Sequence, residues 1–177
     1  EWVKVCGNAE NIYIHKKSAM SAMRFLKCCA YMPTAYESIV SATAGEVITE
    51  VLFPFLCLRE DDEAMFASDI DDFSRYILDE TISELNERQV ASNTINALCS
   101  FDKKFHDGSI IYSVLGFINN GLEEDESPRT FGFIHLLGVL RKKIKKLPEI
   151  WNGQLEDVLV DKVVPRTRSD NPAIRYR

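Results

Sequence analysis

Apolar residues recur at the spacing of an α-helix along nearly the whole chain, and this pattern constrains the fold more than any other feature. One helical face between positions 47 and 56 carries six of them: Val47, Ile48, Val51, Leu52, Phe55 and Leu56. Similar stripes follow through to position 159, and no segment alternates apolar and polar residues with the period of two that marks a strand. The sequence therefore predicts an all-α fold.

Helix starts recur at a nearly constant separation. The segments NERQVASNTINALC, SPRTFGFIHLLGVL and NPAIRYR begin at Asn86, Ser127 and Asn171, which are 41 and 44 residues apart. Ser127 and Asn171 are residues that cap helices, and the proline after each fits a first helical turn. Each interval holds two helical stripes with a short break between them.

A period of about 40–47 residues with two helices per period is that of HEAT and armadillo repeats. We therefore expect an α-α superhelix, a HEAT-repeat solenoid of about four helical hairpins, in which neighbouring hairpins cover each other's apolar faces. The expected units are residues 1–58, 59–126, 127–168 and the start of a further unit at 169–177. Because the last unit stops before its apolar face is complete, we expect the natural protein to continue.

An acidic segment interrupts the helical pattern. Positions 60–87 carry eleven Asp and Glu residues and one basic residue, a net charge of −10 in a chain whose net charge is −6. We expect residues 59–83 to form a connector that presents carboxylates to a positively charged partner. The predicted partner-binding residues are Glu60, Asp61, Asp62, Glu63, Asp69, Asp71 and Asp72.

Three other interpretations of this segment stay open. It can be a solvated connector without a partner. It can be a calcium loop with Asp69, Asp71 and Glu80 as ligands, although Phe73 and Ser74 stand where a ligand and the turn glycine belong. It can hold catalytic carboxylates, which need a buried cleft that a consecutive hydrophilic run does not provide.

Several classes of function find no support in the composition. No apolar run is long enough to cross a bilayer, and the basic carboxyl-terminal part beside an acidic middle does not form one continuous basic face for nucleic acid. The five cysteines form no C-x-x-C pair and stand at no zinc-ligand spacing from a histidine. We therefore expect no enzyme activity, cofactor, metal, membrane insertion or direct nucleic-acid contact. The basic run RKKIKK at 141–146 complements a helix dipole, with a localisation signal or phosphate site as the alternative.

Two patches of sequence resemble the importin-β (karyopherin) superfamily. In VLFPFLCLREDDEAMFASDIDDFSRYILDE the match rests on the order of Pro54, Phe66, Asp69, Asp72, Phe73, Arg75 and Asp79. In GFIHLLGVL, which is similar to GALHMIGSL of the importin-seven and importin-eight branch, it rests on Gly132, His135 and Gly138, followed by Pro165 in VVP. Ile70, Ser74 and Phe131 depart from the family pattern.

The resemblance implies the central part of a nuclear transport receptor that shuttles between cytoplasm and nucleus through the nuclear pore. Its partners would be the Ran GTPase, protein cargo and phenylalanine-glycine nucleoporins. In this interpretation Phe66 and Phe73 hold the acidic connector against the repeat, and its carboxylates meet a basic face of Ran or of a cargo. An export receptor of the cellular-apoptosis-susceptibility type and a HEAT scaffold subunit unrelated to transport are the alternatives.

Overall fold

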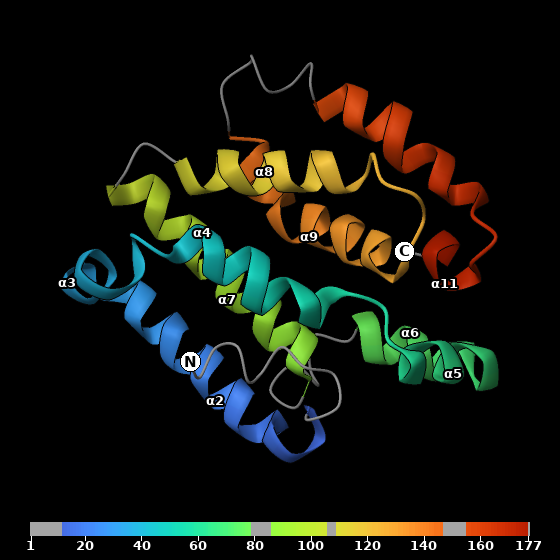
Figure 1. The fold of residues 1–177 in the computed structure, drawn as a ribbon, viewed down its shortest axis with the longest axis horizontal. Helices are drawn as coiled ribbons and strands as arrows, with labels where there is room; N and C mark the ends of the chain where they lie inside the picture. The colour runs from blue at the N-terminus through green and yellow to red at the C-terminus, as the bar shows by residue number, and fades with distance from the viewer. Residues whose placement is uncertain (1–11, 79–85, 106–108, 147–154, 177) are drawn as a thin grey trace.

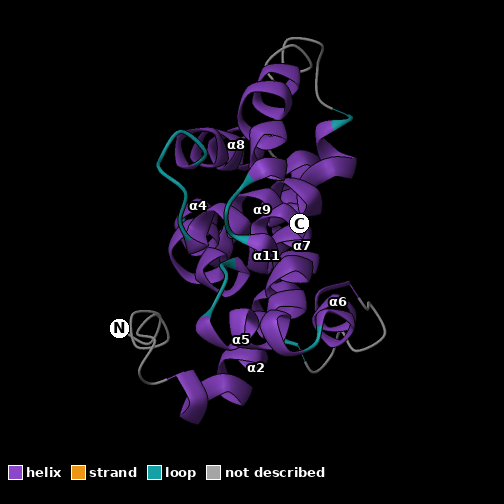
Figure 2. Cartoon of the chain, turned by 90° about the vertical axis from the view of Figure 1, so that its right-hand side faces the viewer, coloured by secondary structure: helices purple, strands orange, loops and turns teal. Residues whose placement is uncertain are grey.

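The computed structural model describes residues 12–78, 86–105, 109–146 and 155–176, which are mostly helical and contain no strand (Figures 1 and 2). The all-α prediction is confirmed. The elements, with η for a π or 3₁₀ segment, are α2 (Ile12–Tyr31), α3 (Pro33–Ala35), η2 (Tyr36–Val40), α4 (Ala44–Glu46), η3 (Val47–Leu52), η4 (Phe53–Leu56), α5 (Glu60–Ser68), α6 (Ile70–Leu78), α7 (Glu87–Phe105), α8 (Ser109–Gly121), α9 (Pro128–Ile144), η6 (Val158–Val163), η7 (Val164–Arg168) and α11 (Pro172–Tyr176).

The helices lie in two rows. The first row runs α2, α7, α9 and α11, each in contact with the next, and the second contains α4 with η3 and η4, then α8, then η6. In Figure 2 α4 and α8 lie on one side of α7, α9 and α11, and α6 lies on the other side. The apolar core lies between the rows and includes Ile48, Leu98, Val114 and Leu140.

Hydrogen bonds join the pair α7 and α8 to the pair formed by α9 and the helix that contains η6 at a nearly constant sequence separation. In the first row Ser92 bonds His135, and Lys143 bonds Ser100, both 43 residues apart. In the second row Lys162 donates to the Asn119 side chain, again 43 residues away, and Arg166 donates to the Leu122 carbonyl 44 residues away. These separations match the 41 and 44 residues between the helix starts in the sequence.

The corresponding contact between α2 and α7 spans more of the chain. The Thr94 hydroxyl donates to the Met23 carbonyl, 71 residues away, because α5 and α6 lie between the two helices in the sequence. Over its described part, the acidic segment expected at 59–83 forms two helices that meet at Asp69. Asp69 caps the second of them, since its Oδ1 accepts the N–H groups of Asp71 and Asp72 at 2.9 and 3.0 Å.

Two helices of the second row end in the same way, at Pro54 and Pro165. Each changes from a π segment to a 3₁₀ segment, η3 to η4 and η6 to η7, with the proline as the second residue of the 3₁₀ segment. Proline has no N–H to continue the α-helical pattern, so the turns around it adopt other spacings. Pro54 and Pro165 thus each mark a change of helix type at a helix end.

Helix capping explains where three first-row helices begin. The Asn86 side chain accepts the N–H of Arg88, and the Asn171 side chain accepts the N–H of Ala173, both at 2.9 Å. At α9 the Ser127 N–H donates to the Thr130 hydroxyl at 3.1 Å, and Pro128 is the first helical residue. Asn171, Pro128 and Pro172 thus stand at helix starts as the sequence predicted.

Two glycines allow close packing, Gly121 of α8 against α9 and Gly132 of α9 against the chain that follows η4. The Phe133 ring lies against Gly121, where a Cβ would come within 2.0 Å of it, and packs on Phe53 and Phe117 with ring centroids 4.5 and 5.2 Å away. A Cβ on Gly132 would lie 3.0 Å from Cys57 Sγ and 3.2 Å from the Cys57 backbone, so α9 rests directly on the chain that follows η4.

We expect Gly132→Ala to lower the free energy of unfolding by about 1 to 3 kcal/mol, because the added methyl overpacks α9 against the Cys57 backbone. Gly116→Ala is the matched control, since a Cβ there meets nothing within 4 Å and alanine favours the helix by up to about 1 kcal/mol. Urea unfolding followed by circular dichroism measures both. Equal effects of the two substitutions would contradict the close approach at Gly132.

Candidate functional site

The acidic helices α5 and α6, here called the acidic arm, are held against the first row by aromatic contacts. Phe73 is fully buried, and the Phe66 ring centroid lies 5.0 Å from it. Both rings face Tyr176 of α11, with centroids 6.1 and 6.0 Å away. Phe131, Ala173 and Ile174 complete the cluster. The prediction that Phe66 and Phe73 hold the acidic segment in place agrees with these contacts.

Polar contacts join the same elements. The Asn171 amide donates to Glu63 Oε1 at 3.0 Å, and the hydroxyls of Ser74 and Tyr176 are in contact. These residues are about a hundred positions apart in the sequence, so the arm ties an early part of the chain to α11. Glu63 therefore has a structural role in addition to its charge.

Asp62 has a role that the sequence did not indicate. Its carboxylate is 2% exposed and accepts a hydrogen bond from Arg88 Nη2 at 2.5 Å, and Arg88 is itself 1% exposed. Arg88 also donates to the Cys57 carbonyl at 2.8 Å and lies over the Phe131 ring, 5.3 Å from its centroid. The prediction of Asp62 as an exposed partner-binding residue is wrong, because its charge is neutralised inside the protein.

A second buried carboxylate extends this network. One carboxylate oxygen of Glu87 lies 2.5 Å from Arg59 Nη1, and the other lies 2.8 Å from Lys16 Nζ. Arg59 also donates to the Tyr76 hydroxyl at 3.1 Å, which connects the network to α6. Burial by itself would raise the pKa of the Glu87 carboxyl, but the hydrogen bonds from Lys16 and Arg59 outweigh it and hold that pKa below its usual value.

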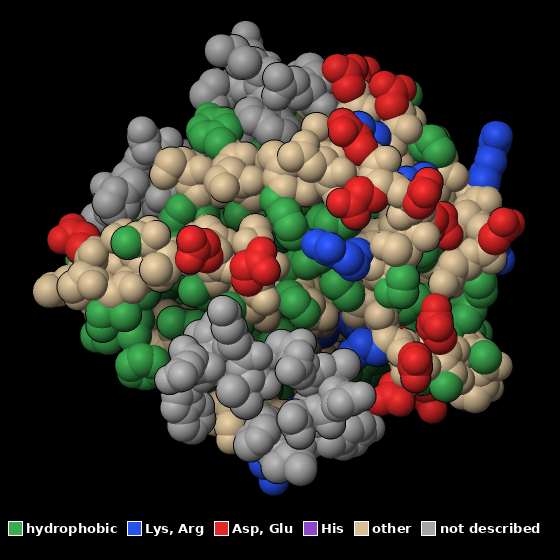
Figure 3. Space-filling view, in the orientation of Figure 1, with side chains coloured by type: hydrophobic (Ala, Val, Ile, Leu, Met, Phe, Trp, Pro, Cys, Tyr) green, Lys and Arg blue, Asp and Glu red, His purple; other side chains and the backbone are tan. Residues whose placement is uncertain are grey.

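The remaining acidic residues of the arm face solvent. Glu60, Asp61, Asp71 and Asp72 are exposed, as are the side chains of Glu63 and Asp69 described above. Arg75 lies 3.5 Å from Asp72, an exposed pair that contributes little to stability. Figure 3 shows Asp and Glu side chains gathered over the arm and over the helix that contains η6. The arm is thus an anchored, exposed and negatively charged surface.

The other residues of the family signature have structural positions. His135 is buried in α9, and its Nε2 lies 3.0 Å from the Ser92 hydroxyl of α7, as expected for a histidine that bridges two helices. Gly138 lies half-buried in the same helix, and Pro165 is exposed in η7. Asp79 lies outside the described residues.

The residues that anchor the arm from the other side were not predicted. Arg59, Glu87 and Arg88 are charged residues in a charged stretch, and no periodicity distinguishes them from their exposed neighbours. Tyr176 stands at the far end of the chain. The predicted helix start at Asn86 was the only sequence feature that pointed to burial of Arg88. It places this side chain in the first turn of a helix that other helices pack against, where solvent has little access.

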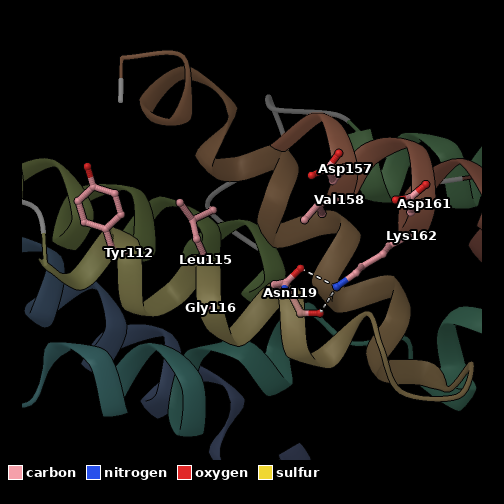
Figure 4. A pocket seen from close by; sticks show the side chains of 8 residues that line it. All are labelled: Tyr112, Leu115, Gly116, Asn119, Asp157, Val158, Asp161 and Lys162. Carbon is pink, nitrogen blue, oxygen red and sulfur yellow. Dashed lines mark hydrogen bonds between the residues drawn. The ribbon is translucent and has the colours of Figure 1, made fainter. Parts of the chain in front are cut away.

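A groove of about 460 Å³ lies between α8 and the helix of the second row that contains η6 (Figure 4). Tyr112 and Leu115 line it from α8, and Asp157 and Asp161 from the facing helix. Gly116 has no side chain there, which leaves its floor open. Lys162 closes one end, with its Nζ 2.6 Å from the Asn119 side chain and 2.7 Å from Glu123.

Within the described residues no group of three or more His, Cys, Asp or Glu side chains is arranged to hold a metal ion. Burial raises the pKa of the Cys57 thiol to about 11, with Arg129 and Arg88 opposing the shift, so the thiol is protonated at neutral pH.

Over the residues that the structure describes, no single helix has the length and apolar content to span a membrane. One bent pair, Pro33–Val40 with Ala44–Ser68 at 83°, meets those two criteria when taken together.

Comparison of the chain with protein-family models, with curated proteins and with solved structures finds no match.

We expect Asp62→Asn to lower the free energy of unfolding by about 3 to 5 kcal/mol, because it leaves the Arg88 guanidinium buried without a counter-charge. The exposed neighbour Glu60 provides the control, and Glu60→Gln should change stability by less than about 0.5 kcal/mol. Urea unfolding at neutral pH separates the two. A small effect of Asp62→Asn would mean that Arg88 has other means of neutralisation.

The lowered pKa of Glu87 predicts a pH dependence of stability. A depressed carboxyl pKa contributes stability that is fully present above its ordinary value of about 4.5 and is lost as the pH falls through the folded-state value. We expect Glu87→Gln to cost about 2 kcal/mol at pH 7 and to unfold with a shallower pH dependence below pH 4.5. Thermal unfolding across pH 3 to 7 measures this, with exposed Glu50→Gln retaining the parent slope.

Proposed function

We propose that this chain is a segment of a nuclear transport receptor of the importin-β superfamily, built as a HEAT-repeat solenoid, that binds protein cargo under the control of Ran. The observation that carries the proposal is the acidic arm. It combines the quoted signature residues with buried anchors at Asp62 and Phe73 and a half-buried one at Phe66, and it presents the remaining carboxylates to solvent. An anchored negative surface steers and orients a positively charged partner without first having to fold.

The repeat geometry supports the solenoid part of the proposal. Between the pair α7 and α8 and the pair α9 and η6, contacts lie 43 or 44 residues apart in both rows, and Pro54 and Pro165 terminate second-row helices in the same manner. In such a stack each pair contacts mainly its neighbours, so small changes at each interface add up to a change of curvature. A change of curvature lets one bound partner alter the affinity for another.

Negative charge gathers at two places, over the acidic arm and over the helix that contains η6 (Figure 3). In the proposed receptor the arm contacts a basic face of Ran or of a cargo, and helices of the two rows offer sites to cargo and to phenylalanine-glycine nucleoporins. The receptor shuttles between cytoplasm and nucleus.

A charge-reversal experiment in the full-length receptor tests the role of the arm. Glu60→Lys/Asp71→Lys/Asp72→Lys reverses exposed charges and spares Asp62, Glu63 and Asp69, which have structural contacts. We expect the affinity for GTP-loaded Ran or for a basic cargo to fall at least about tenfold at low salt, because close charge pairs across an interface are lost. Titration calorimetry measures both partners.

The matched control is Glu37→Lys/Glu46→Lys/Glu50→Lys, which makes the same change of net charge at exposed positions outside the arm. Unchanged affinity of the arm variant for both partners, or an equal loss in the control, would show that the arm is not the contact surface. Cargo release on adding GTP-loaded Ran indicates an import receptor, and cargo binding only with Ran indicates an export receptor. Binding of neither Ran nor phenylalanine-glycine repeats would instead favour a scaffold.

A further inference from the structure

The longest run of exposed residues lies where the two helices of the acidic arm meet. Residues 67–72 are all exposed, and no other part of the chain that the structure describes has so long a run. Ser68 is the last residue of α5, and Asp69 separates it from α6 with an extended backbone, at φ −153° and ψ 103°. The Ser68 hydroxyl therefore stands at an exposed break between two helices.

Within the described residues the Ser68 hydroxyl shares its acceptor with the backbone. It donates to the Met65 carbonyl at 3.0 Å, and the same carbonyl accepts the Asp69 N–H at 2.8 Å. When the side chain turns outward, the carbonyl keeps its backbone hydrogen bond and the hydroxyl bonds water instead, so the rotation costs little. The hydroxyl is thus available to a reaction partner in solvent.

Acidic residues follow Ser68 closely. Asp69, Asp71 and Asp72 occupy three of the next four positions, and no other serine or threonine of the sequence has as many carboxylates there. All three side chains are exposed, and the nearest cation to them, Arg75, forms only an exposed pair with Asp72 at 3.5 Å. Protein kinases select substrates by such charge patterns, and a kinase with a basic substrate groove selects carboxylates after the hydroxyl.

The first turn of α6 has to open for residues 69–72 to enter a kinase groove as an extended segment. Helix ends open at a lower free energy than the interior of a fold, and this end has no buried side chain before Phe73. The ion pair of Asp62 with Arg88 lies outside the segment and keeps α5 attached while the turn opens. The segment can therefore be bound without unfolding of the arm.

We propose that Ser68 is a phosphorylation site for an acid-directed serine kinase, which recognises Asp71 and Asp72. The Ser68 Oγ attacks the γ-phosphorus of ATP, and the bond from that phosphorus to the bridging oxygen breaks to release ADP. The hydroxyl proton passes to the catalytic aspartate of the kinase. The product is a phosphoserine with a charge between about −1.5 and −2 at neutral pH.

The phosphate adds negative charge to the arm at a place that no anchor uses. It stands at the carboxyl end of α5 beside Asp69, where the helix dipole and the carboxylate both repel it, so it points into solvent. The anchors at Asp62 and Phe73 are buried away from it. A resulting gain in affinity for a positively charged partner rests on the proposed function, whereas the phosphorylation itself does not.

Incubation of the full chain with ATP and casein kinase II, an acid-directed kinase, tests the site, and mass spectrometry locates the phosphate. We expect Ser68 to be the main acceptor, so that Ser68→Ala lowers incorporation at least about fivefold. The matched control is Ser38→Ala. It removes an exposed hydroxyl that also bonds a backbone carbonyl but has no acidic residue in the next four positions, and it should incorporate as much phosphate as the parent.

A second variant keeps the hydroxyl and removes the charges that the kinase is expected to recognise. We expect Asp71→Asn/Asp72→Asn to lower the initial rate of incorporation at least about fivefold, because two charge pairs with the kinase are lost. Glu37→Gln/Glu46→Gln removes two exposed carboxylates elsewhere and should leave the rate unchanged. Absence of phosphate on the parent, equal incorporation by Ser68→Ala, or an unchanged rate for Asp71→Asn/Asp72→Asn would overturn the proposal.

The affinity for a partner separates this site from the proposed function. We expect the phosphorylated full-length receptor to bind GTP-loaded Ran or a basic cargo at least about threefold more tightly at low salt. Phosphate on Ser68 without a change of either affinity would support the site and count against the arm as the contact surface. Absence of phosphate, together with weaker binding by the charge-reversal variant of the arm, would count against the site alone.

Discussion

The buried ion pair between Asp62 and Arg88 is the contact on which the position of the acidic arm depends. It joins the first turn of α5 to the first turn of α7, and Arg88 continues to the Cys57 carbonyl and the Phe131 ring. Each of the two buried charges is stabilised by the other, so moving either helix away would leave an unpaired charge in apolar surroundings. The aromatic cluster around Phe73 adds a second attachment, and together they turn a highly charged stretch into a rigid surface.

This arrangement separates charges that hold the arm from charges that face solvent. Asp62 and Glu87 are neutralised by Arg88, Arg59 and Lys16, whereas Glu60, Asp61 and Asp71 stay in water. The buried carboxylates cost desolvation and require partners, and the exposed ones retain their long-range field. A negatively charged surface built in this way meets a partner without an ordering cost, which is the physical basis of the function proposed for it.

Hydrogen bonds at a nearly constant sequence separation join α7 to α9 and α8 to the helix that contains η6. The helix α9 lies between an acidic end, where Phe131 meets the arm, and a basic end, where three lysines line a groove. The two ends of one helix thus carry surfaces of opposite charge.

The sequence by itself determined the helical class, the helix starts at Asn86, Ser127 and Asn171, and the spacing of the repeat, because periodicity, caps and prolines act locally. It also indicated Phe66 and Phe73 as anchors through the family resemblance. Only the tertiary structure decided which carboxylates are buried, since Asp62 differs from Glu60 only through Arg88, 26 residues further along the chain. Likewise the contact of α6 with Tyr176 and the groove beside Lys142 are formed by residues that are distant in the sequence. The stacking of the helices brings them together, and local sequence patterns do not predict it.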